Sequence, residues 1–171
     1  GPRDVPAYRR GAAMSTGVWS NLREKFRTAE RCTEASCHDK PASSAADDEV
    51  EPPDRAEIGR AAWRYLHALA AHHPERPTPR EQESAQAWIA SFVQFYPCQH
   101  CAEHFVGVCE EMPPRTASRE EYSVWWCEAH NRVSQSLQNE TRRCDPARLI
   151  AAGLAGLALD ELPAGGAGKV E

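Results

Sequence analysis

Residues 78–101 read TPREQESAQAWIASFVQFYPCQHC, and this stretch holds the strongest structural signals in the chain. It opens with a capping box of Thr78 and Glu81, with a proline at the first helical position. Apolar residues then recur on one helical face: Ala85, Trp88, Ile89, Phe92, Val93 and Tyr96. Pro97 ends the pattern, and the cysteine motif Cys98-x-x-Cys101 follows at once. The stretch therefore predicts an amphipathic helix followed by a cysteine pair at the start of another helix.

The segments on either side contain similar signals for helix starts. Asp54 with Glu57, Ser118 with Glu121, and Asp145 before a proline are all typical of helix starts. The sequence predicts further helices over about 54–73, 98–110, 118–137 and 145–159. No window alternates polar and apolar residues between hairpin turns, so strands are not expected. The fold is predicted to be all-α, a four-helix bundle plus a short fifth helix.

The composition of the chain argues against several classes of protein. Its 171 residues are 41% hydrophobic and carry a net charge of −5, which suits one domain with tails and disfavours a nucleic-acid-binding protein. The longest apolar run, Leu149 to Leu159, is too short to span a membrane. The seven cysteines are too few for a scaffold held by disulfides alone, and an odd number cannot all pair within one chain.

We expect one helical domain over residues 54–160, between a flexible arm at 1–53 and a disordered tail at 161–171. The arm is polar and carries the pair Cys32-x4-Cys37. About the first 13 residues resemble the remnant of an expression tag, and no secretory signal is visible near the start. Within the arm, Trp19, Leu22 and Phe26 suit one short amphipathic turn.

The motif Cys98-x-x-Cys101 indicates thiol chemistry, because free amide groups and the positive end of the helix dipole favour a thiolate at a helix start. The same motif also occurs in zinc sites, and a site that adds His104 and a second histidine stays open, although zinc normally takes two close ligand pairs. A thioredoxin-type site is disfavoured, because its motif follows a strand. The interpretation that remains is a redox pair on an all-helical scaffold.

The other cysteines allow more than one role. Cys127 and Cys144, with sixteen residues between them, would tie the fifth helix to the bundle if bridged, and are otherwise two buried free thiols. Cys109 is expected to be a buried, unpaired thiol. Cys32 and Cys37 are candidate shuttle residues that would reach a redox site through the arm, or else they are incidental or link two subunits.

Aromatic and histidine side chains cluster in the same helices as the cysteine motif. On periodicity alone, Trp63, His67 and His130 belong to the core. The same rings equally suit a flat aromatic cofactor held between helices. A dithiol loses two electrons on becoming a disulfide, and a flavin accepts two electrons and releases them singly or in pairs.

Six motifs follow one another between Arg55 and Cys144. They are Ile58-Gly59-Arg60-Ala61-Ala62-Trp63, Leu66-His67, His73-Pro74, Phe95-Tyr96-Pro97-Cys98, Cys101-Ala102-Glu103 and Trp126-Cys127-Glu128-Ala129-His130-Asn131-Arg132-Val133. Together they resemble the Erv/ALR family of FAD-dependent sulfhydryl oxidases, of the mitochondrial type. The resemblance implies a four-helix bundle with a short fifth helix that binds FAD and forms a homodimer.

The resemblance also implies a role for each motif position. Cys101 would lie next to the flavin, Cys98 would exchange with incoming dithiols, and Cys127–Cys144 would be a structural disulfide. The positions that would line the FAD are Gly59, Arg60, Trp63, His67, Tyr96, Cys127, His130, Asn131, Val133, Ser134 and Leu137. Among these, Trp63 and the helix of His130 would pack the rings, and His67 and Asn131 would supply hydrogen bonds. No metal is expected.

We therefore predict an FAD-linked thiol oxidase that forms disulfides in substrate proteins and passes electrons to oxygen or cytochrome c. The resemblance implies a mitochondrial intermembrane-space location and, as substrate, a dithiol protein or an import-linked thiol carrier. No nucleic acid and no membrane span are expected. The alternatives are a non-enzymatic zinc-binding domain and a disulfide-stapled helical adaptor.

Overall fold

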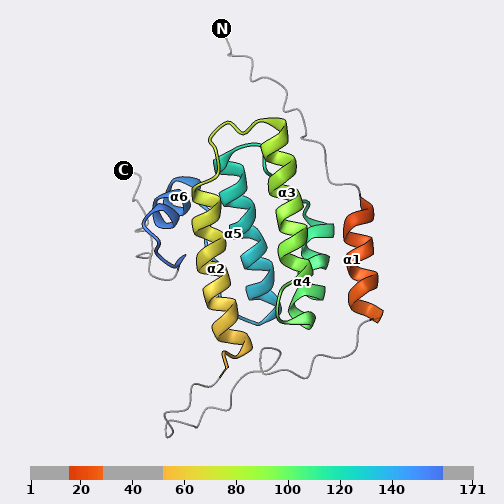
Figure 1. The fold of residues 1–171 in the computed structure, drawn as a ribbon. Helices are drawn as coiled ribbons and strands as arrows, with labels where there is room; N and C mark the ends of the chain where they lie inside the picture. Colours follow the sequence, from red (N-terminus) through yellow and green to blue (C-terminus); the bar gives the residue numbers. More distant parts are fainter. Residues whose placement is uncertain (1–15, 29–51, 160–171) are drawn as a thin grey trace, which may run out of the picture.

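The computed structural model describes residues 16–28 and 52–159. Within these two ranges it contains six helices and no strand, so the all-α prediction is confirmed. The helices are α1 (Thr16–Thr28), α2 (Arg55–Ala71), α3 (Pro79–Gln94), α4 (Gln99–Glu111), α5 (Arg119–Ser136) and α6 (Pro146–Leu154). Helices α2 to α5 form the bundle, and α6 and α1 lie on opposite sides of it (Figure 1).

The helix starts follow from local side-chain chemistry. The Asp54 carboxylate accepts a hydrogen bond from the Glu57 amide, and the Glu57 carboxylate accepts one from the Asp54 amide, so α2 begins with a complete capping box. Thr78 caps α3 in the same reciprocal way. Ser118 caps α5 through the Glu121 amide, and Asp145 caps α6 through the Arg148 amide.

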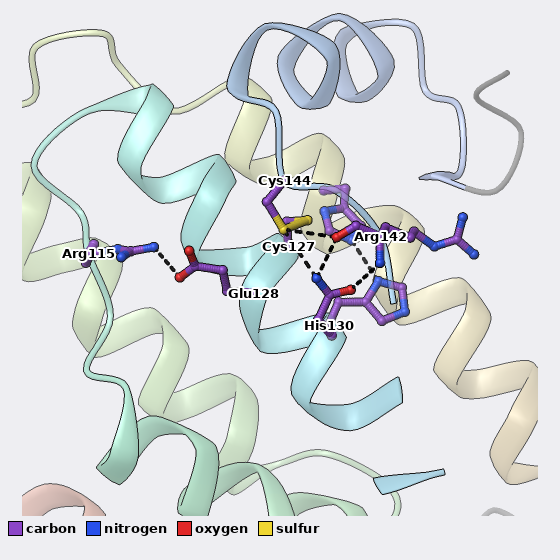
Figure 2. Close-up of a disulfide and its surroundings, with 8 residues drawn as sticks. Arg115, Cys127, Glu128, His130, Arg142 and Cys144 are labelled. Carbon is purple, nitrogen blue, oxygen red and sulfur yellow. Dashed lines mark hydrogen bonds and ion pairs between the residues drawn. A yellow bond between two sulfur atoms is a disulfide. The ribbon is translucent and has the colours of Figure 1, made fainter. Parts of the chain in front are cut away.

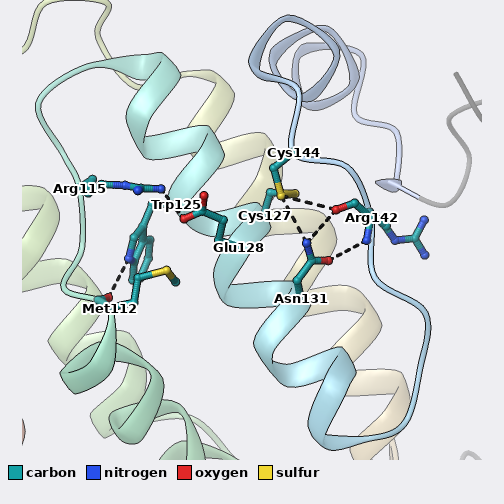
Figure 3. Close-up of polar contacts among 8 residues, drawn as sticks. All are labelled: Met112, Arg115, Trp125, Cys127, Glu128, Asn131, Arg142 and Cys144. Carbon is teal, nitrogen blue, oxygen red and sulfur yellow. Dashed lines mark hydrogen bonds and ion pairs between the residues drawn. A yellow bond between two sulfur atoms is a disulfide. The ribbon is translucent and has the colours of Figure 1, made fainter. Parts of the chain in front are cut away.

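The core of the bundle is dominated by aromatic side chains of α5. Trp125 and Trp126 are fully buried, and their rings meet edge to face with centroids 4.7 Å apart. The Trp125 indole N–H donates to the Met112 carbonyl oxygen at 2.9 Å, so this buried polar group is satisfied (Figure 3). Ile89 and Val93 of α3 are also fully buried in this cluster.

The segment that leads into α6 is joined to α5 by a covalent and a polar link. The Cys127–Cys144 disulfide joins α5 to the segment that leads into α6 (Figure 2). One turn further along α5, the Asn131 side chain donates to the Arg142 carbonyl oxygen at 2.8 Å and accepts from its amide at 2.9 Å (Figure 3). The helix ends at Leu154 rather than near 159, because Gly156 adopts a φ of 67°.

Helix α1 is the main departure from the expected organisation. The expectation of a flexible arm over residues 1–53 does not hold for residues 16–28, which form three turns of helix packed along α4 (Figure 1). Trp19, Leu22 and Phe26, expected to form a single amphipathic turn, are 4%, 7% and 7% exposed. Of the predicted arm and tail, residues 1–15, 29–51 and 161–171 lie outside the described residues.

None of the helices in the described residues is long and apolar enough to cross a membrane.

Candidate functional site

Cys98 and Cys101 form a disulfide at the start of α4. Cys98 is the N-cap residue, and its sulfur accepts a hydrogen bond from the Cys101 amide at 3.3 Å. The two sulfurs have different surroundings. Cys98 is completely buried, whereas Cys101 is partly exposed in the wall of a pocket.

The pocket next to Cys101 lies between α2, α3, α4 and α5 and has a volume of about 300 Å³. Aromatic side chains make up much of its wall, and Gly59 forms part of the wall from α2. A methyl group added at Gly59 would meet nothing within 4 Å, so the backbone there faces open space. The complete lining is Arg55, Gly59, Ala62, Trp63, Leu66, Phe92, Val93, Tyr96, His100, Cys101, Ala102, His104, Phe105, Val133, Ser136 and Leu137.

Five of the positions expected to line a cofactor do line this pocket: Gly59, Trp63, Tyr96, Val133 and Leu137. The other six, Arg60, His67, Cys127, His130, Asn131 and Ser134, lie outside its lining. Burial raises the pKa of Tyr96, so its phenol stays protonated at neutral pH and remains a hydrogen-bond donor.

His67 and His130 are paired with each other immediately behind Trp63. The His67 Nε2 and His130 Nδ1 atoms lie 3.0 Å apart. The His130 ring stacks on the Trp63 indole, with centroids 4.1 Å apart and planes inclined by 8°. Burial, the neighbouring His130 and the charge of Arg142 lower the pKa of His67 to about 3. His67 is therefore neutral at physiological pH and orients the imidazole that supports Trp63.

Asn131, expected to supply a hydrogen bond to the cofactor, lies outside the pocket lining and contacts the loop after α5. Its side-chain amide oxygen and nitrogen are both engaged with the backbone of Arg142, and its Nδ2 also lies 3.4 Å from the Cys144 sulfur. These contacts fasten the loop after α5 (Figure 3). Cys127, fully buried, is bonded to Cys144 and lies in the same region.

Several lining residues were not among the positions expected to line a cofactor. Phe92, Phe105 and Leu66 follow the apolar periodicity of their helices, which does not distinguish a pocket wall from a packed core. His100 and His104 are one turn apart on α4, so both face the side on which Cys101 lies. That spacing is the one signal that points to them.

The remaining cysteines divide into one buried thiol and a pair outside the structure's described ranges. Cys109 is free and completely buried. Cys32 and Cys37 lie outside the described residues. In the described part of the chain, no three His, Cys, Asp or Glu side chains are grouped as metal ligands would be. Cys98 and Cys101, which the zinc hypothesis would need as thiolates, are bonded to each other.

The arrangement suits electron transfer between a disulfide and a flat ring system. Trp63, Phe92 and Phe105 provide aromatic surfaces in a pocket that Cys101 of the disulfide also lines. The open space in front of Gly59 allows a bulky group to approach the α2 backbone. The residues present therefore fit an aromatic redox cofactor, and they fit it on the Cys101 side of the disulfide.

Comparison with known proteins identifies relatives that are FAD-linked sulfhydryl oxidases. Residues 60–151 match the model of the Erv1 / Alr family. The chain is 39% identical over 90 residues to the FAD-linked sulfhydryl oxidase ERV2 of Saccharomyces cerevisiae, covering 53% of this chain and 46% of the relative. It is 38% identical over 96 residues to the mitochondrial FAD-linked sulfhydryl oxidase ERV1 of the same yeast, covering 56% and 51%. The chain thus spans about half the length of these curated relatives.

Among solved structures, the fold is similar to the FAD-binding domain of Erv1 from Saccharomyces cerevisiae. The TM-score is 0.57 at 32% sequence identity, and the match covers 61% of this chain and 98% of that one.

Proposed function

The chain belongs to the Erv1 / Alr family, and from this premise we propose that it is an FAD-dependent thiol oxidase that forms disulfides in substrate proteins. The observation that carries the proposal is the place of Cys101, which belongs to the Cys98–Cys101 disulfide and also to the wall of the aromatic pocket. When bound, FAD supplies a two-electron acceptor that passes electrons on to oxygen or cytochrome c.

Different residues of the pocket would contact different parts of the FAD. Trp63, Tyr96 and Phe105 offer ring surfaces for its flat parts, and Gly59 leaves room along α2. Val133 and Leu137 close the α5 side. We propose that the His67–His130 pair acts indirectly, by fixing the ring against which Trp63 stacks.

Cys98 is the residue that exchanges with the substrate. A substrate thiolate attacks the Cys98 sulfur, which forms a mixed disulfide and releases the Cys101 thiolate into the pocket. The second substrate thiolate then attacks the substrate sulfur of this mixed disulfide and releases Cys98. The substrate leaves as a disulfide, having lost two electrons and two protons. The freed Cys98 thiolate lies at the N-cap of α4, where the Cys101 amide and the helix dipole favour a negative charge.

The pair Cys32 and Cys37 is proposed as a shuttle between protein substrates and Cys98. Residues 29–31 alone separate Cys32 from the end of α1, and α1 packs on the helix that carries the redox pair. Replacing both cysteines by serine is expected to impair oxidation of a protein dithiol and to spare a small dithiol. Equal loss with both substrates would contradict the shuttle.

A homodimer is proposed through the outer face of α2 and α3. Tyr65 is 54% exposed, large for an aromatic residue, and its ring lies 6.1 Å from that of Trp88. Light scattering on Tyr65→Glu is expected to give a monomer if this face holds the two subunits together. A dimer of unchanged stability would place the interface elsewhere.

For its location we propose the mitochondrial intermembrane space, with a dithiol protein or an import-linked thiol carrier as substrate. The support is that one of the relatives carries a mitochondrial name. Fractionation of mitochondria with selective opening of the outer membrane tests this proposal, and recovery of the protein in the matrix would contradict it.

The proposed activity is tested on the purified protein by its absorption spectrum and by oxygen uptake with a dithiol. Bound flavin and dithiol-dependent uptake are expected in the wild type. Cys98→Ser is expected to retain the flavin and lose the uptake. A colourless protein, or unchanged uptake in Cys98→Ser, would contradict the proposal.

A further inference from the structure

The sulfur that must meet the substrate is the less accessible of the two. Cys98 has an exposed fraction of 0%, while Cys101 is open to the pocket on the cofactor side. Attack on a disulfide needs the incoming thiolate to approach the target sulfur directly. If Cys98 is the exchange residue of the proposed function, on which this inference rests, part of the protein must move before exchange begins.

The last turn of α1 contacts residues that precede Cys98 in the sequence and residues that follow it. The Phe26 carbonyl oxygen accepts a hydrogen bond from the Gln99 side chain at 3.2 Å. On the other side, the Lys25 ammonium lies 5.7 Å from the centre of the Phe95 ring. One helical turn therefore bridges the residues that precede and follow Cys98.

Helix α1 is attached to α4 by an apolar stripe and one ion pair. Trp19, Leu22 and Phe26 are buried in the same cluster as the inner face of α4. The Arg23 guanidinium pairs with the Glu110 carboxylate, its Nε lying 3.0 Å from Oε2. The side chains of this pair are 47% and 31% exposed, so the link is a weak one that solvent competes for.

We propose that α1 is a releasable cover of Cys98, and that its undocking from α4 precedes thiol exchange at this sulfur. With α1 docked, the sulfur is closed to dithiols. With α1 released, a substrate thiolate reaches Cys98, forms the mixed disulfide and displaces the Cys101 thiolate, and a second substrate thiolate completes the exchange. The fraction of molecules with α1 released then sets the rate at which the disulfide is reduced.

The test measures reduction of the Cys98–Cys101 disulfide by excess dithiothreitol without oxygen, followed by alkylation and peptide mass spectrometry. Arg23→Glu is expected to raise the rate constant by about threefold to fivefold, the range expected for an exposed ion pair. Leu22→Ala removes an apolar anchor and is expected to raise it by about tenfold or more. The double variant Arg23→Glu/Glu110→Arg re-forms the pair and is expected to return to within about twofold of the wild type.

Arg27→Ala is the matched control, because Arg27 pairs only with Glu24 on its own helix in the contacts of the described residues. It is expected to leave the rate unchanged. The Cys127–Cys144 disulfide packs with residues of α6, and its reduction in the same samples reports whether a variant has become less stable throughout.

Two results would overturn the proposal. One is a wild-type or lower rate in both Arg23→Glu and Leu22→Ala. The other is an equal acceleration of both disulfides, since that would reflect general unfolding. The readout needs neither bound flavin nor turnover, so it is independent of the test of the proposed activity. If the protein is an active oxidase and the Cys98–Cys101 disulfide is reduced at the same rate in all variants, only the proposal that α1 covers Cys98 is rejected.

Discussion

At the scale of single residues, the cysteine at the N-cap of α4 and the two within this helix differ through their surroundings. Cys101 opens onto the aromatic pocket, Cys98 is buried at the N-cap, and Cys109 is enclosed in the core two turns away. They lie on one continuous stretch of chain, but the start and the periodicity of α4 direct them to different environments. Their proposed roles as cofactor-side sulfur, exchange sulfur and inert thiol follow from these positions.

The buried His67 gives the protein a defined sensitivity to acid. Its pKa is about 3 in the folded protein and near 6.5 when unfolded, so between these values the unfolded chain binds the additional proton. Folding stability contributed by the neutral imidazole is therefore complete above pH 6.5 and declines as the pH falls toward 3. The slope from this one group is up to about 1.4 kcal/mol per pH unit.

Urea unfolding at a series of pH values from neutral to acid measures this effect. His67→Gln keeps a hydrogen-bonding side chain beside His130 but does not titrate, so its stability is expected to fall less steeply with acid. Parallel pH profiles for the two proteins would show that His67 is not the titrating group.

Cys109 is expected to be unreactive in the folded protein, because burial raises the pKa of its thiol. Iodoacetamide at about pH 8 should leave Cys109 unlabelled in native protein and label it in urea. Cys109→Ala is expected to retain thiol oxidase turnover within about twofold, because this thiol is free, is buried and does not line the pocket. Rapid native labelling, or loss of turnover in Cys109→Ala, would give this thiol a role in the chemistry.

At the scale of helices, the sequence predicts the starts well because side-chain chemistry of two or three residues decides them. Asp54, Thr78, Ser118 and Asp145 all cap the helices that they were expected to begin. The docking of α1 was not predictable in this way. Its buried residues Trp19, Leu22 and Phe26 stand in a polar context, and only the matching surface of α4 decides that they become buried.

The contact between α6 and α2 depends on one glycine. A methyl group at Gly153 would lie 2.5 Å from the Ala71 Cβ and 2.6 Å from the His67 carbonyl oxygen. Gly153→Ala is therefore expected to push the two helices apart and to destabilise the protein by about 1–3 kcal/mol. Chemical unfolding measures this difference.

Gly107→Ala is the matched control within the same experiment. The added methyl group would lie at an ordinary 3.5 Å from the Arg23 guanidinium, and alanine favours helix over glycine. Its stability is expected to equal or exceed that of the wild type. Equal losses in the two variants would show that close packing at Gly153 is not the cause.

At the scale of the whole molecule, the disulfide lies between two elements that approach it from different sides. The pocket reaches Cys101 from within the bundle, and α1 crosses the neighbourhood of Cys98 from outside it. This arrangement separates Cys98, the proposed exchange residue, from the proposed cofactor pocket. The Cys98–Cys101 disulfide connects the two regions.

The site was predictable from the sequence where motif positions coincide with the pocket, as for Gly59, Trp63 and Tyr96. The site was not predictable where a motif residue contacts a distant part of the chain and does not line the pocket. Asn131 is engaged with the loop at Arg142, a contact between residues eleven positions apart that no local pattern specifies. The same holds for Phe105, whose spacing marks a core residue and whose ring forms a pocket wall.

The central claim is that electrons leave the substrate through Cys98 and enter the pocket through Cys101. Flavin absorbance after anaerobic mixing of the purified protein with a dithiol tests it directly, with Cys109→Ala as the matched control. We predict that the flavin band bleaches in the wild type and in Cys109→Ala, and that it persists in Cys101→Ser with the flavin still bound. Bleaching of Cys101→Ser at the wild-type rate would contradict the account.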